Sequence, residues 1–372
     1  MFADYFQGRK VLVTGHTGFK GGWLLAWLKL LGAEIVGLAL PPEGEGLFGD
    51  LEREDFFYSH MGDIRDKELV GEVFQEHQPE VVFHMAAQSL VRRGYRIPAE
   101  TYETNVMGTV NVLEAVRQTG SVRVVVNVTS DKCYENREWE FGYRENDAMG
   151  GYDPYSSSKG CAELVAQAYE RSFFSAPDSS AGTTGGGHPA KIASARSGNV
   201  IGGGDWAEDR IVPDCFRALR QGQDIQVRNP PAVRPWQHVL EPLSGYLWLA
   251  ASMGAGKIDH RGGWNFGPGT DANKSVGHVV ELLLGHWGRG EWRDGSGGVQ
   301  PHEAGLLQLN CSKAAGLLGW NPVFSLPEAV RVTVDWYRAS LAGGDFRCLE
   351  FTTGQIEDYQ NRAREKEMPW AV

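Results

Sequence analysis

The side chains of Tyr155 and Lys159 are of types, and at a spacing, that would allow them to act together in proton transfer. Four residues apart on a helix, they share one face, so the lysine ammonium can lie near the tyrosine phenol. A nearby cation favours the ionised phenol, whose ordinary pKa is about 10. We therefore expect Tyr155 to accept a proton, with Lys159 helping to bring its pKa toward neutrality.

A hydroxyl, a carboxylate and an amine follow one another at Ser130, Asp131 and Lys132, directly after an apolar run at 123–128. Such a set can supply a hydrogen-bond donor, a general acid and a general base. An ordinary polar strand end is the alternative. A base at Lys132 is demanding, because an ammonium of pKa about 10.4 must lose its proton near neutral pH. A charged Asp131 beside it would oppose that loss.

Three glycines, Gly15, Gly18 and Gly21, lie between a β-branched run at 10–14 and an apolar run of helical period at 23–31. This spacing allows a tight turn, brings backbone N–H groups to a pyrophosphate and lets the helix pack on the sheet. The sequence thus predicts a dinucleotide site formed by Gly15, His16, Thr17, Gly18, Phe19, Lys20 and Gly21. For Lys20, a cation at the phosphates and an ordinary solvated lysine are both open.

The adenosine end of the dinucleotide is less well defined by the sequence. Residues 37–40 carry no acidic side chain and Pro41 follows them, so NAD and NADP are not distinguished by the usual carboxylate. Asp63 and Ile64, at the end of the third expected strand, are predicted to contact the adenine. A helix cap is the alternative role for Asp63.

The elements that must position these residues alternate along the first half of the chain. Strands are expected at 10–14, 34–40, up to 63, 81–85, 123–128 and 191–196, and helices at 23–31, 67–77, 99–118 and 155–171. This alternation predicts an α/β fold with a doubly wound, parallel Rossmann-type sheet. We expect 1–200 to form this domain and 201–372 to be mainly a smaller, mixed α/β substrate lobe, with parts of 236–270 returning to the sheet. The stretches 175–190 and 294–298 are predicted surface loops.

Composition and charge exclude several classes of protein. Lys plus Arg number 36 against 47 Asp plus Glu, a formal net charge of −11 that argues against nucleic acid as a partner. The cysteines are scattered without a C-x-x-C pair, so we expect no disulfide framework and no metal site. The region 23–40 is interrupted by Lys29, Gly32 and Glu34 and falls short of the ~20 apolar residues of a membrane span. With no secretory signal at 1–10, we expect a cytoplasmic protein.

Several segments together resemble the extended short-chain dehydrogenase/reductase family, whose members act on nucleotide sugars. The shared motifs lie at 14–21, 86–88, 129–132 and 155–159. Within that family, this chain resembles the 4,6-dehydratases at 196–206, 233–242 and 264–268. It also has Asp131-Lys132 where related dehydratases carry Asp-Glu. The resemblance covers nearly the whole chain. It implies tightly bound NAD that is regenerated each turnover, a nucleotide-sugar substrate of deoxysugar (O-antigen type) biosynthesis, and a homodimer or dimer of dimers. Cytidine as the base is expected from overall resemblance alone.

The resemblance also implies a role for each residue. Tyr155 takes the proton of the sugar 4-hydroxyl while hydride passes from C4 to NAD, and Ser130 bonds the same oxygen. Lys132 then removes the C5 proton, Asp131 protonates the departing C6 hydroxyl, and the hydride returns to C6. Lys159 orients the nicotinamide ribose, and the nicotinamide cation shares in lowering the pKa of Tyr155. Further implied contacts are Ala86, Ala87, Gln88 and Asn105 for the cofactor and Ser89, Asn199, Arg210, Arg234 and His302 for the substrate.

Two other interpretations remain. A 4-epimerase, or a dehydratase of another nucleotide sugar, would share Tyr155, Lys159 and Ser130. A simple epimerase has no use for an acid and a base directed at C6 and C5, so Asp131 and Lys132 count against it. A non-catalytic NAD-binding sensor on the same fold could dispense with Tyr155 and Lys159.

Overall fold

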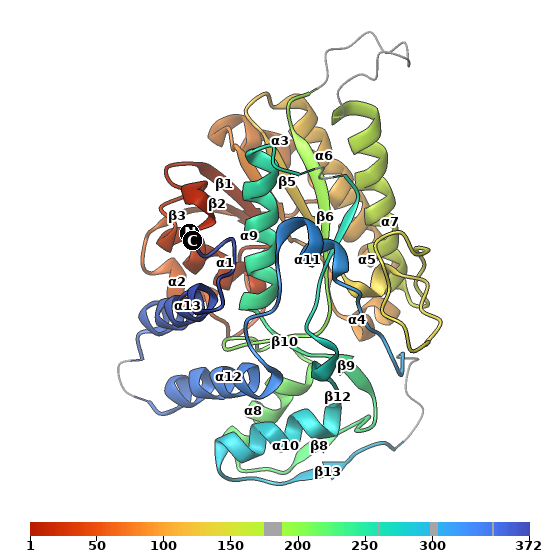
Figure 1. The fold of residues 1–372 in the computed structure, drawn as a ribbon, viewed down its shortest axis with the longest axis vertical. Helices are drawn as coiled ribbons and strands as arrows, with labels where there is room; N and C mark the ends of the chain where they lie inside the picture. The colour runs from red at the N-terminus through yellow and green to blue at the C-terminus, as the bar shows by residue number, and fades with distance from the viewer. Residues whose placement is uncertain (175–187, 259–260, 298–303, 344–345) are drawn as a thin grey trace.

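Apolar, β-branched runs form the central sheet of the computed structural model, which describes residues 1–174, 188–258, 261–297, 304–343 and 346–372. In these residues the sheet has seven strands, all paired in parallel, in the order β11-β6-β5-β4-β1-β2-β3 (Figure 1). The strands are β1 (Lys10–Thr14), β2 (Glu34–Ala39), β3 (Phe57–Met61), β4 (Val81–His84), β5 (Val124–Val128), β6 (Lys191–Ser197) and β11 (Gly263–Phe266). The predicted doubly wound α/β fold is confirmed.

The two faces of the sheet pack into separate cores. In β1, Val11 and Val13 face one core and Leu12 the other, because successive strand residues point to opposite faces. Helices α1 (Phe19–Leu30) and α9 (Leu240–Gly254) cover the first face, with α13 (Cys348–Glu365) packed against α1; α3 (Lys67–His77), α6 (Gly108–Gln118) and α7 (Pro154–Tyr169) cover the second. Cover on both faces explains why the strand runs are apolar throughout.

Most predicted bounds agree with the structure to within a few residues. The strand at 10–14 and the helix at 67–77 are confirmed as β1 and α3. The helix expected at 23–31 begins earlier, at Phe19, because Gly21 and Gly22 form its first turn rather than the end of the loop. The helix expected at 99–118 is α5 (Pro98–Tyr102), a π-helical turn η2 (Glu103–Met107) and α6 in succession. Two short helices, α2 (Phe48–Glu52) and α4 (Val91–Arg96), were not expected.

Beyond residue 200, short strands pair outside the main sheet, below it in Figure 1. The pairs are β7 (Val200–Ile201) with β10 (Gln237–His238), β8 (Ile225–Val227) with β13 (Trp292–Asp294), and β9 (Val233–Pro235) with β12 (Asn273–Ser275). The helices beside them are α8 (Ile211–Gln221), α10 (Val276–Trp287) and α12 (Leu326–Leu341), whereas α11 (Ser312–Leu318) packs on β11 and α9. The short turns are η1 (Phe2–Asp4), η3 (Asp131–Cys133), η4 (Glu170–Phe174) and η5 (Thr270–Ala272). Helix α9 and strand β11, by contrast, lie on the main sheet. The domain division at 200 stays a prediction. Of the two expected loops, 175–187 and 298 lie outside the described residues.

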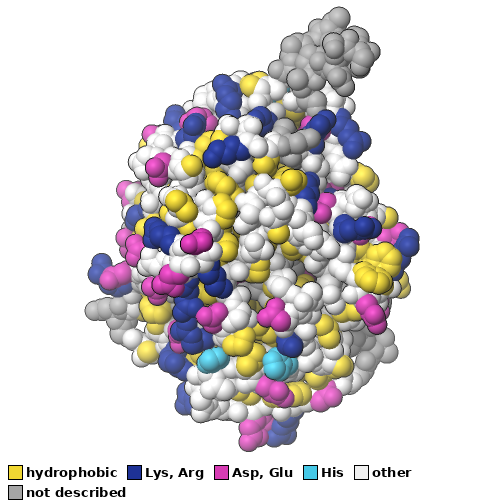
Figure 2. All heavy atoms as spheres, in the orientation of Figure 1, with side chains coloured by type: hydrophobic (Ala, Val, Ile, Leu, Met, Phe, Trp, Pro, Cys, Tyr) yellow, Lys and Arg dark blue, Asp and Glu magenta, His cyan; other side chains and the backbone are white. Residues whose placement is uncertain are grey.

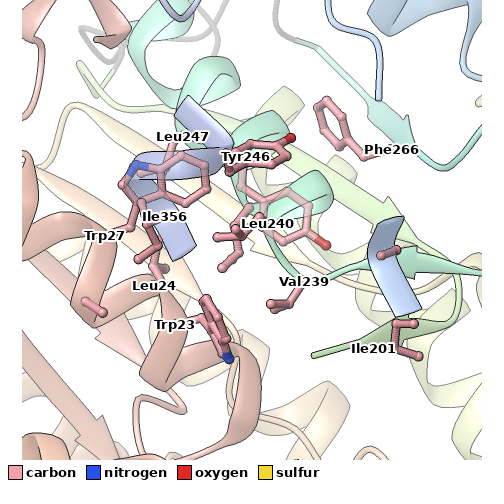
Figure 3. Close-up of a cluster of buried hydrophobic side chains, with 14 of the residues drawn as sticks. Trp23, Leu24, Trp27, Ile201, Val239, Leu240, Tyr246, Leu247, Phe266 and Ile356 are labelled. Atoms are coloured by element: carbon pink, nitrogen blue, oxygen red, sulfur yellow. The ribbon is translucent and has the colours of Figure 1, made fainter. Parts of the chain in front are cut away.

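One hydrophobic core joins the sheet to the C-terminal elements. Figure 3 shows Trp23 and Trp27 of α1 with Leu240 of α9 and Ile356 of α13 gathered in that core, and all four are fully buried. The ends of the chain also meet, since the N marker and the C marker coincide in Figure 1 and the amide of Phe2 donates to the Trp370 carbonyl at 2.7 Å. Helix α1, which follows the glycine loop, is therefore packed between the sheet and the C-terminal elements.

Charged side chains of both signs are interspersed over the face in Figure 2. Many form ion pairs, such as Arg220 with Glu45 at 3.0 Å. In the described ranges, every helix is too short or too polar to cross a bilayer.

Candidate active site

The predicted site residues gather at the carboxyl ends of neighbouring strands. The glycine loop follows β1, Ala86 follows β4, Ser130 follows β5 and Gly198 follows β6. Strands β1 and β4 are adjacent, yet the chain leaves them in opposite directions across the sheet. Such a switch point is where open α/β sheets bind ligands.

The glycine loop has the geometry that a dinucleotide requires. Gly15 has φ +77°, and a Cβ there would lie 2.7 Å from the Ala86 nitrogen. A Cβ on Gly21 would lie 2.3 Å from the Gly15 carbonyl oxygen, so only glycine lets α1 approach the loop. Gly18 is the N-cap of α1 and offers no side-chain cap, which leaves the first N–H groups of the helix for an anion. The loop therefore fits a pyrophosphate.

His16 and Thr17 connect this loop to the next two strands. The His16 Nε2 atom lies 2.8 Å from the Ser59 hydroxyl, and the Thr17 hydroxyl donates to the Leu40 carbonyl at 2.9 Å. Burial lowers the pKa of His16 to about 4, so its imidazole is neutral at physiological pH. A Cβ on Gly37 would lie 2.4 Å from the His16 ring, so this imidazole occupies the space above the second strand.

Asp63 and Ile64 follow β3 as predicted, and Asp63 does not take its alternative role as a helix cap. The Asp63 carboxylate accepts hydrogen bonds from Arg65, including one from Nε at 2.8 Å. Partial burial raises the pKa of Asp63, and the bonds from Arg65 outweigh this and lower it. Helix α3 is capped by Asp66, so a capping role for Asp63 is wrong. Ile64 is buried against Gly108. The adenine contact stays a prediction.

Asn105 holds the loop after β4 against α7. Its Oδ1 accepts from the Gln88 amide at 2.8 Å, and its Nδ2 donates to the Gln88 carbonyl at 3.0 Å and to the Ser158 hydroxyl at 2.8 Å. Because Ser158 directly precedes Lys159, these bonds set the position of Ala86, Ala87 and Gln88 relative to the Tyr155 helix. The direct cofactor contacts of these four residues stay predictions.

Tyr155 lies in the first turn of α7, whose start is defined by the Asp153 cap and Pro154. Burial raises the pKa of Tyr155 to about 12, although a hydrogen bond with Ser130 and the Arg210 charge act in the other direction. Lys159 donates instead to the Val128 carbonyl at 3.4 Å, and burial lowers the pKa of Lys159 to about 8. In the protein alone, burial outweighs the nearby cations at Tyr155, and the expectation that Lys159 and the nicotinamide cation together bring its pKa toward neutrality stays a prediction.

Ser130, Asp131 and Lys132 share one short turn, η3, whose N-cap is Ser130. Ser130 Oγ donates to Asp131 Oδ1 at 2.9 Å, while Asp131 Oδ2 is buried and has no hydrogen-bond partner in the described part of the chain. Burial raises the pKa of Asp131, and the charge of half-buried Lys132 opposes that rise. The carboxyl of Asp131 is thus harder to ionise than that of an ordinary aspartate.

Lys20 crosses from α1 to the end of β6. Its Nζ donates to Ser197 Oγ at 2.8 Å, and the Tyr246 hydroxyl donates to the same oxygen at 2.8 Å. Burial, followed by the Arg210 charge, lowers the pKa of Lys20 to about 7. Lys20 is half-buried and bonded to Ser197, which disfavours the solvated-lysine alternative. A contact of Lys20 with the phosphates stays a prediction, and the sequence interpretation did not predict the bonds that join Lys20, Ser197 and Tyr246.

The predicted substrate residues that the structure describes lie near this centre. Arg210 donates to Asp205 Oδ2 at 3.0 Å and to the Ser89 hydroxyl at 3.1 Å, so two of them are already in contact. Arg234 is buried, and its charge acts on Asp131. Asn199 directly follows Gly198, and a Cβ added to Gly198 would lie 3.1 Å from Asp131 Oδ2. His302 lies outside the described residues.

The sequence interpretation missed a buried ion pair beneath the site. Arg196 Nε donates to Glu163 Oε1 at 2.8 Å, and both side chains are 0% exposed. Glu163 lies one helical turn after Lys159. A charged residue on the buried face of α7 was the signal that could have revealed it.

A possible metal-ligand group lies at the edge strand β3. In the described residues, His60, Glu76 and His77 bring ligand atoms within 4.8 Å of one another. The Nε2 atoms of His60 and His77 are 2.6 Å apart and share a hydrogen bond. In the metal-free protein, that bond uses the lone pair of one of the two Nε2 atoms.

Comparisons with known proteins agree on one group of enzymes. The family model for GDP-mannose 4,6 dehydratase matches residues 12–176. A CDP-glucose 4,6-dehydratase from Salmonella typhimurium is 49% identical over 359 residues, which cover 96% of this chain and 98% of that protein. A UDP-glucose 4-epimerase from Thermotoga maritima, solved with UDP-glucose, has a TM-score of 0.75 at 23% identity and covers 89% of this chain and 99% of that chain. A UDP-glucose 4-epimerase from Thermus thermophilus, solved with NAD, has a TM-score of 0.74 at 25% identity and covers 88% of this chain and 99% of that chain.

Proposed function

The chain belongs to the NAD-dependent nucleotide-sugar dehydratase and epimerase family, and we propose that it is a CDP-glucose 4,6-dehydratase. It is a lyase that converts CDP-D-glucose into CDP-4-keto-6-deoxy-D-glucose and water. One observation of the structure supports this proposal above the others. A buried carboxyl with an open oxygen, Asp131, lies on the same turn as an amine, Lys132, and beside the Ser130 hydroxyl that reaches Tyr155.

The cofactor is NAD. When bound, NAD would supply the hydride acceptor for C4 and the hydride donor for C6, and its oxidised nicotinamide would carry a positive charge. We propose that the N–H groups at the start of α1 hold its pyrophosphate, because Gly18 leaves them uncapped. Lys159, close to Tyr155 on the same helix face, is proposed to hold the nicotinamide ribose. His16 and Thr17 are proposed to close the adenosine end.

Tyr155 is proposed to accept the proton of the sugar 4-hydroxyl. With a pKa of about 12 the phenol keeps its own proton in the protein alone. Arg210 and the bond with Ser130 already act to lower that pKa, and one more positive charge nearby acts in the same direction. Ionisation of Tyr155 is therefore proposed to be coupled to occupation of the site, so that the phenol stays protonated until the cofactor is bound.

Asp131 and Lys132 are proposed to carry the elimination. Once C4 is a ketone, the C5–H bond is acidic, and Lys132 takes that proton as the C6–O bond breaks. Asp131 gives its proton to the leaving oxygen, which departs as water. The hydride then adds to C6 and the proton held by Lys132 returns to C5. The proton that Tyr155 took from the 4-hydroxyl must then pass to Asp131, directly or through solvent, so that both groups are restored for the next turnover. Proton delivery by a positioned acid contributes about 10² to 10⁴ in rate.

Arginines are proposed to hold the diphosphate of the substrate. Arg234 and Arg210 provide two guanidinium groups near Asp131 and Tyr155, and guanidinium groups bind phosphate oxygens in pairs. Ser89, Asn199 and His302 are proposed as further contacts. Selection of cytidine rests on the identity to the Salmonella enzyme.

A substrate panel tests the proposal. The protein is incubated separately with CDP-, dTDP-, GDP- and UDP-hexoses, and mass spectrometry follows the loss of one water. We expect loss from CDP-glucose. Loss from dTDP-glucose alone would overturn the cytidine assignment, and inversion at C4 without water loss would identify an epimerase instead.

We also propose a cytoplasmic homodimer, or a dimer of dimers, formed through α6 and α7. Exposed apolar side chains on this side support the proposal: Leu164 of α7 is 55% exposed, and Met107, just before α6, is 51% exposed. Sedimentation of the wild type and of Leu164→Glu tests it. A wild type that sediments as a monomer at micromolar concentration would contradict it.

A further inference from the structure

The segment that carries the acid and the base is anchored at both ends to one buried ion pair. At its start, the Thr129 hydroxyl donates to Glu163 Oε1 at 2.5 Å. At its end, Arg196 Nη1 donates to the Tyr134 hydroxyl at 2.6 Å. Glu163 and Arg196 are in turn joined by two hydrogen bonds of 2.8 Å. Residues 129–134 therefore form a loop closed through the ion pair.

The same ion pair is attached to the helix of Tyr155. Glu163 lies on α7, two turns after Tyr155 and one turn after Lys159. Arg196 comes from β6, and Tyr134 also donates to Asn265 Oδ1 of β11 at 2.8 Å. The group for C4 and the groups for C5 and C6 are thus connected through rigid elements rather than through solvent.

Stability alone is a poor explanation for this arrangement. A buried ion pair must recover the desolvation of both charges, and apolar residues of similar volume are often as stabilising. The Arg196 guanidinium nevertheless fits only because residue 263 is glycine, since a Cβ there would lie 2.2 Å from Arg196 Nη2. The side chains of Thr129, Tyr134, Glu163 and Arg196 are all buried, so their geometry is restricted by packing.

We propose that Thr129, Tyr134, Glu163 and Arg196 are positioning residues that hold Asp131 and Lys132 in register with Tyr155. This inference rests on the proposed function. Both half-reactions act on one sugar, and the acid must reach O6 while the phenol reaches O4. A displacement of about 1 Å in such a group can cost about 100-fold in rate. Loosening the loop should therefore impair the elimination more than the oxidation at C4.

The chain offers a matched pair of variants. Tyr134→Phe removes the hydroxyl that bonds Arg196 and Asn265. Tyr143→Phe makes the same change in a neighbouring buried tyrosine, whose hydroxyl accepts from Arg137 N at 2.6 Å and donates to Asn136 Oδ1 at 3.0 Å. Each variant loses two bonds of a buried hydroxyl, so similar changes in thermal midpoint are expected.

The measurement separates the two half-reactions. Single-turnover mixtures with CDP-glucose are quenched and reduced with borodeuteride, and mass spectrometry counts the sugars oxidised at C4 with and without loss of water. In Tyr134→Phe we expect C4 oxidation and KM within about twofold of wild type, and water loss slower by about 10-fold to 100-fold. In Tyr143→Phe we expect both steps within about twofold. Thr129→Val, an isosteric change at the other end of the loop, is expected to resemble Tyr134→Phe.

Each outcome bears on the inference. Equal loss of both steps in Tyr134→Phe and Thr129→Val, or an unchanged ratio of the two steps, would overturn it while wild-type dehydration still supports the proposed function. Selective loss of water release in Tyr143→Phe as well would overturn it, because the effect would then belong to any buried tyrosine. Absence of water loss in the wild type would overturn the proposed function and this inference together.

Discussion

Ser130 Oγ donates a hydrogen bond to Asp131 Oδ1 at 2.9 Å and leaves Asp131 Oδ2 without a partner in the described residues. A buried carboxyl oxygen without a donor favours the protonated acid, because the charged form lacks compensation. The adjoining hydroxyl reaches Tyr155 as well. One serine thus connects Tyr155, the proposed proton acceptor for the 4-hydroxyl, with Asp131, the proposed proton donor for the 6-hydroxyl.

Asp131→Asn should separate oxidation from dehydration. The amide keeps an acceptor for Ser130 but has no proton to give to O6. We expect water loss to fall by about 10² to 10⁴ while oxidation at C4 persists. Quenched single-turnover samples, analysed by mass, report both steps. Water loss at the wild-type rate would remove Asp131 from the role of acid.

Tyr155→Phe should abolish both steps, because oxidation at C4 precedes the elimination. The expected loss is about 10² to 10⁴ in turnover, with CDP-glucose affinity retained. Tyr152→Phe, three residues earlier and 79% exposed, is the matched control and should keep wild-type turnover. Water loss in Tyr155→Phe near the wild-type rate would show that another group accepts the proton.

Two helical glycines offer a contrast at the cofactor loop. Gly21→Ala places a Cβ 2.3 Å from the Gly15 carbonyl, so the loop must move, and NAD affinity should fall at least about tenfold. Gly71→Ala, within α3, meets nothing within 4 Å and should stabilise the fold by about 0.5 to 1 kcal/mol. Calorimetric titration with NAD and thermal unfolding measure the two effects. Unchanged NAD affinity in Gly21→Ala would contradict the proposed pyrophosphate site.

Lys20 should make stability depend on pH. Its pKa is lowered to about 7 in the folded protein, against about 10.4 in the unfolded chain. Between these values the unfolded state binds the extra proton, so the wild type gains stability as pH rises. Lys20→Met lacks this pH-dependent contribution to the free energy of unfolding.

Unfolding by urea at several pH values tests the Lys20 prediction. The stability of Lys20→Met relative to the wild type should be greatest below pH of about 7 and should decline up to pH of about 10. A relative stability that does not change with pH would show that Lys20 is not desolvated as the structure indicates.

Local pattern was sufficient for most of the fold. The apolar runs of β1 and β5 and the amphipathic period of α3 reflect burial of whole strand faces and one helix face, which sequence period reports directly. The start of α1 was misplaced because glycine is a poor helix former in isolation. Glycine is required at position 21 of the helix, because a Cβ there would lie 2.3 Å from the Gly15 carbonyl oxygen. The pairs of short strands after residue 200 have no such period and depend on contacts far apart in the chain.

The sequence by itself determined the chemical groups of the site: the glycine loop, the Tyr155 and Lys159 pair and the turn at 130–132 are each set by residues close together in the chain. Only the tertiary structure decided how those groups behave, because a pKa depends on burial and on neighbours from distant segments. It turned Lys20 toward Ser197, gave Asp131 an open oxygen and kept the pKa of Tyr155 high. It also placed Arg196 against Glu163, a contact across 33 residues that local spacing does not report.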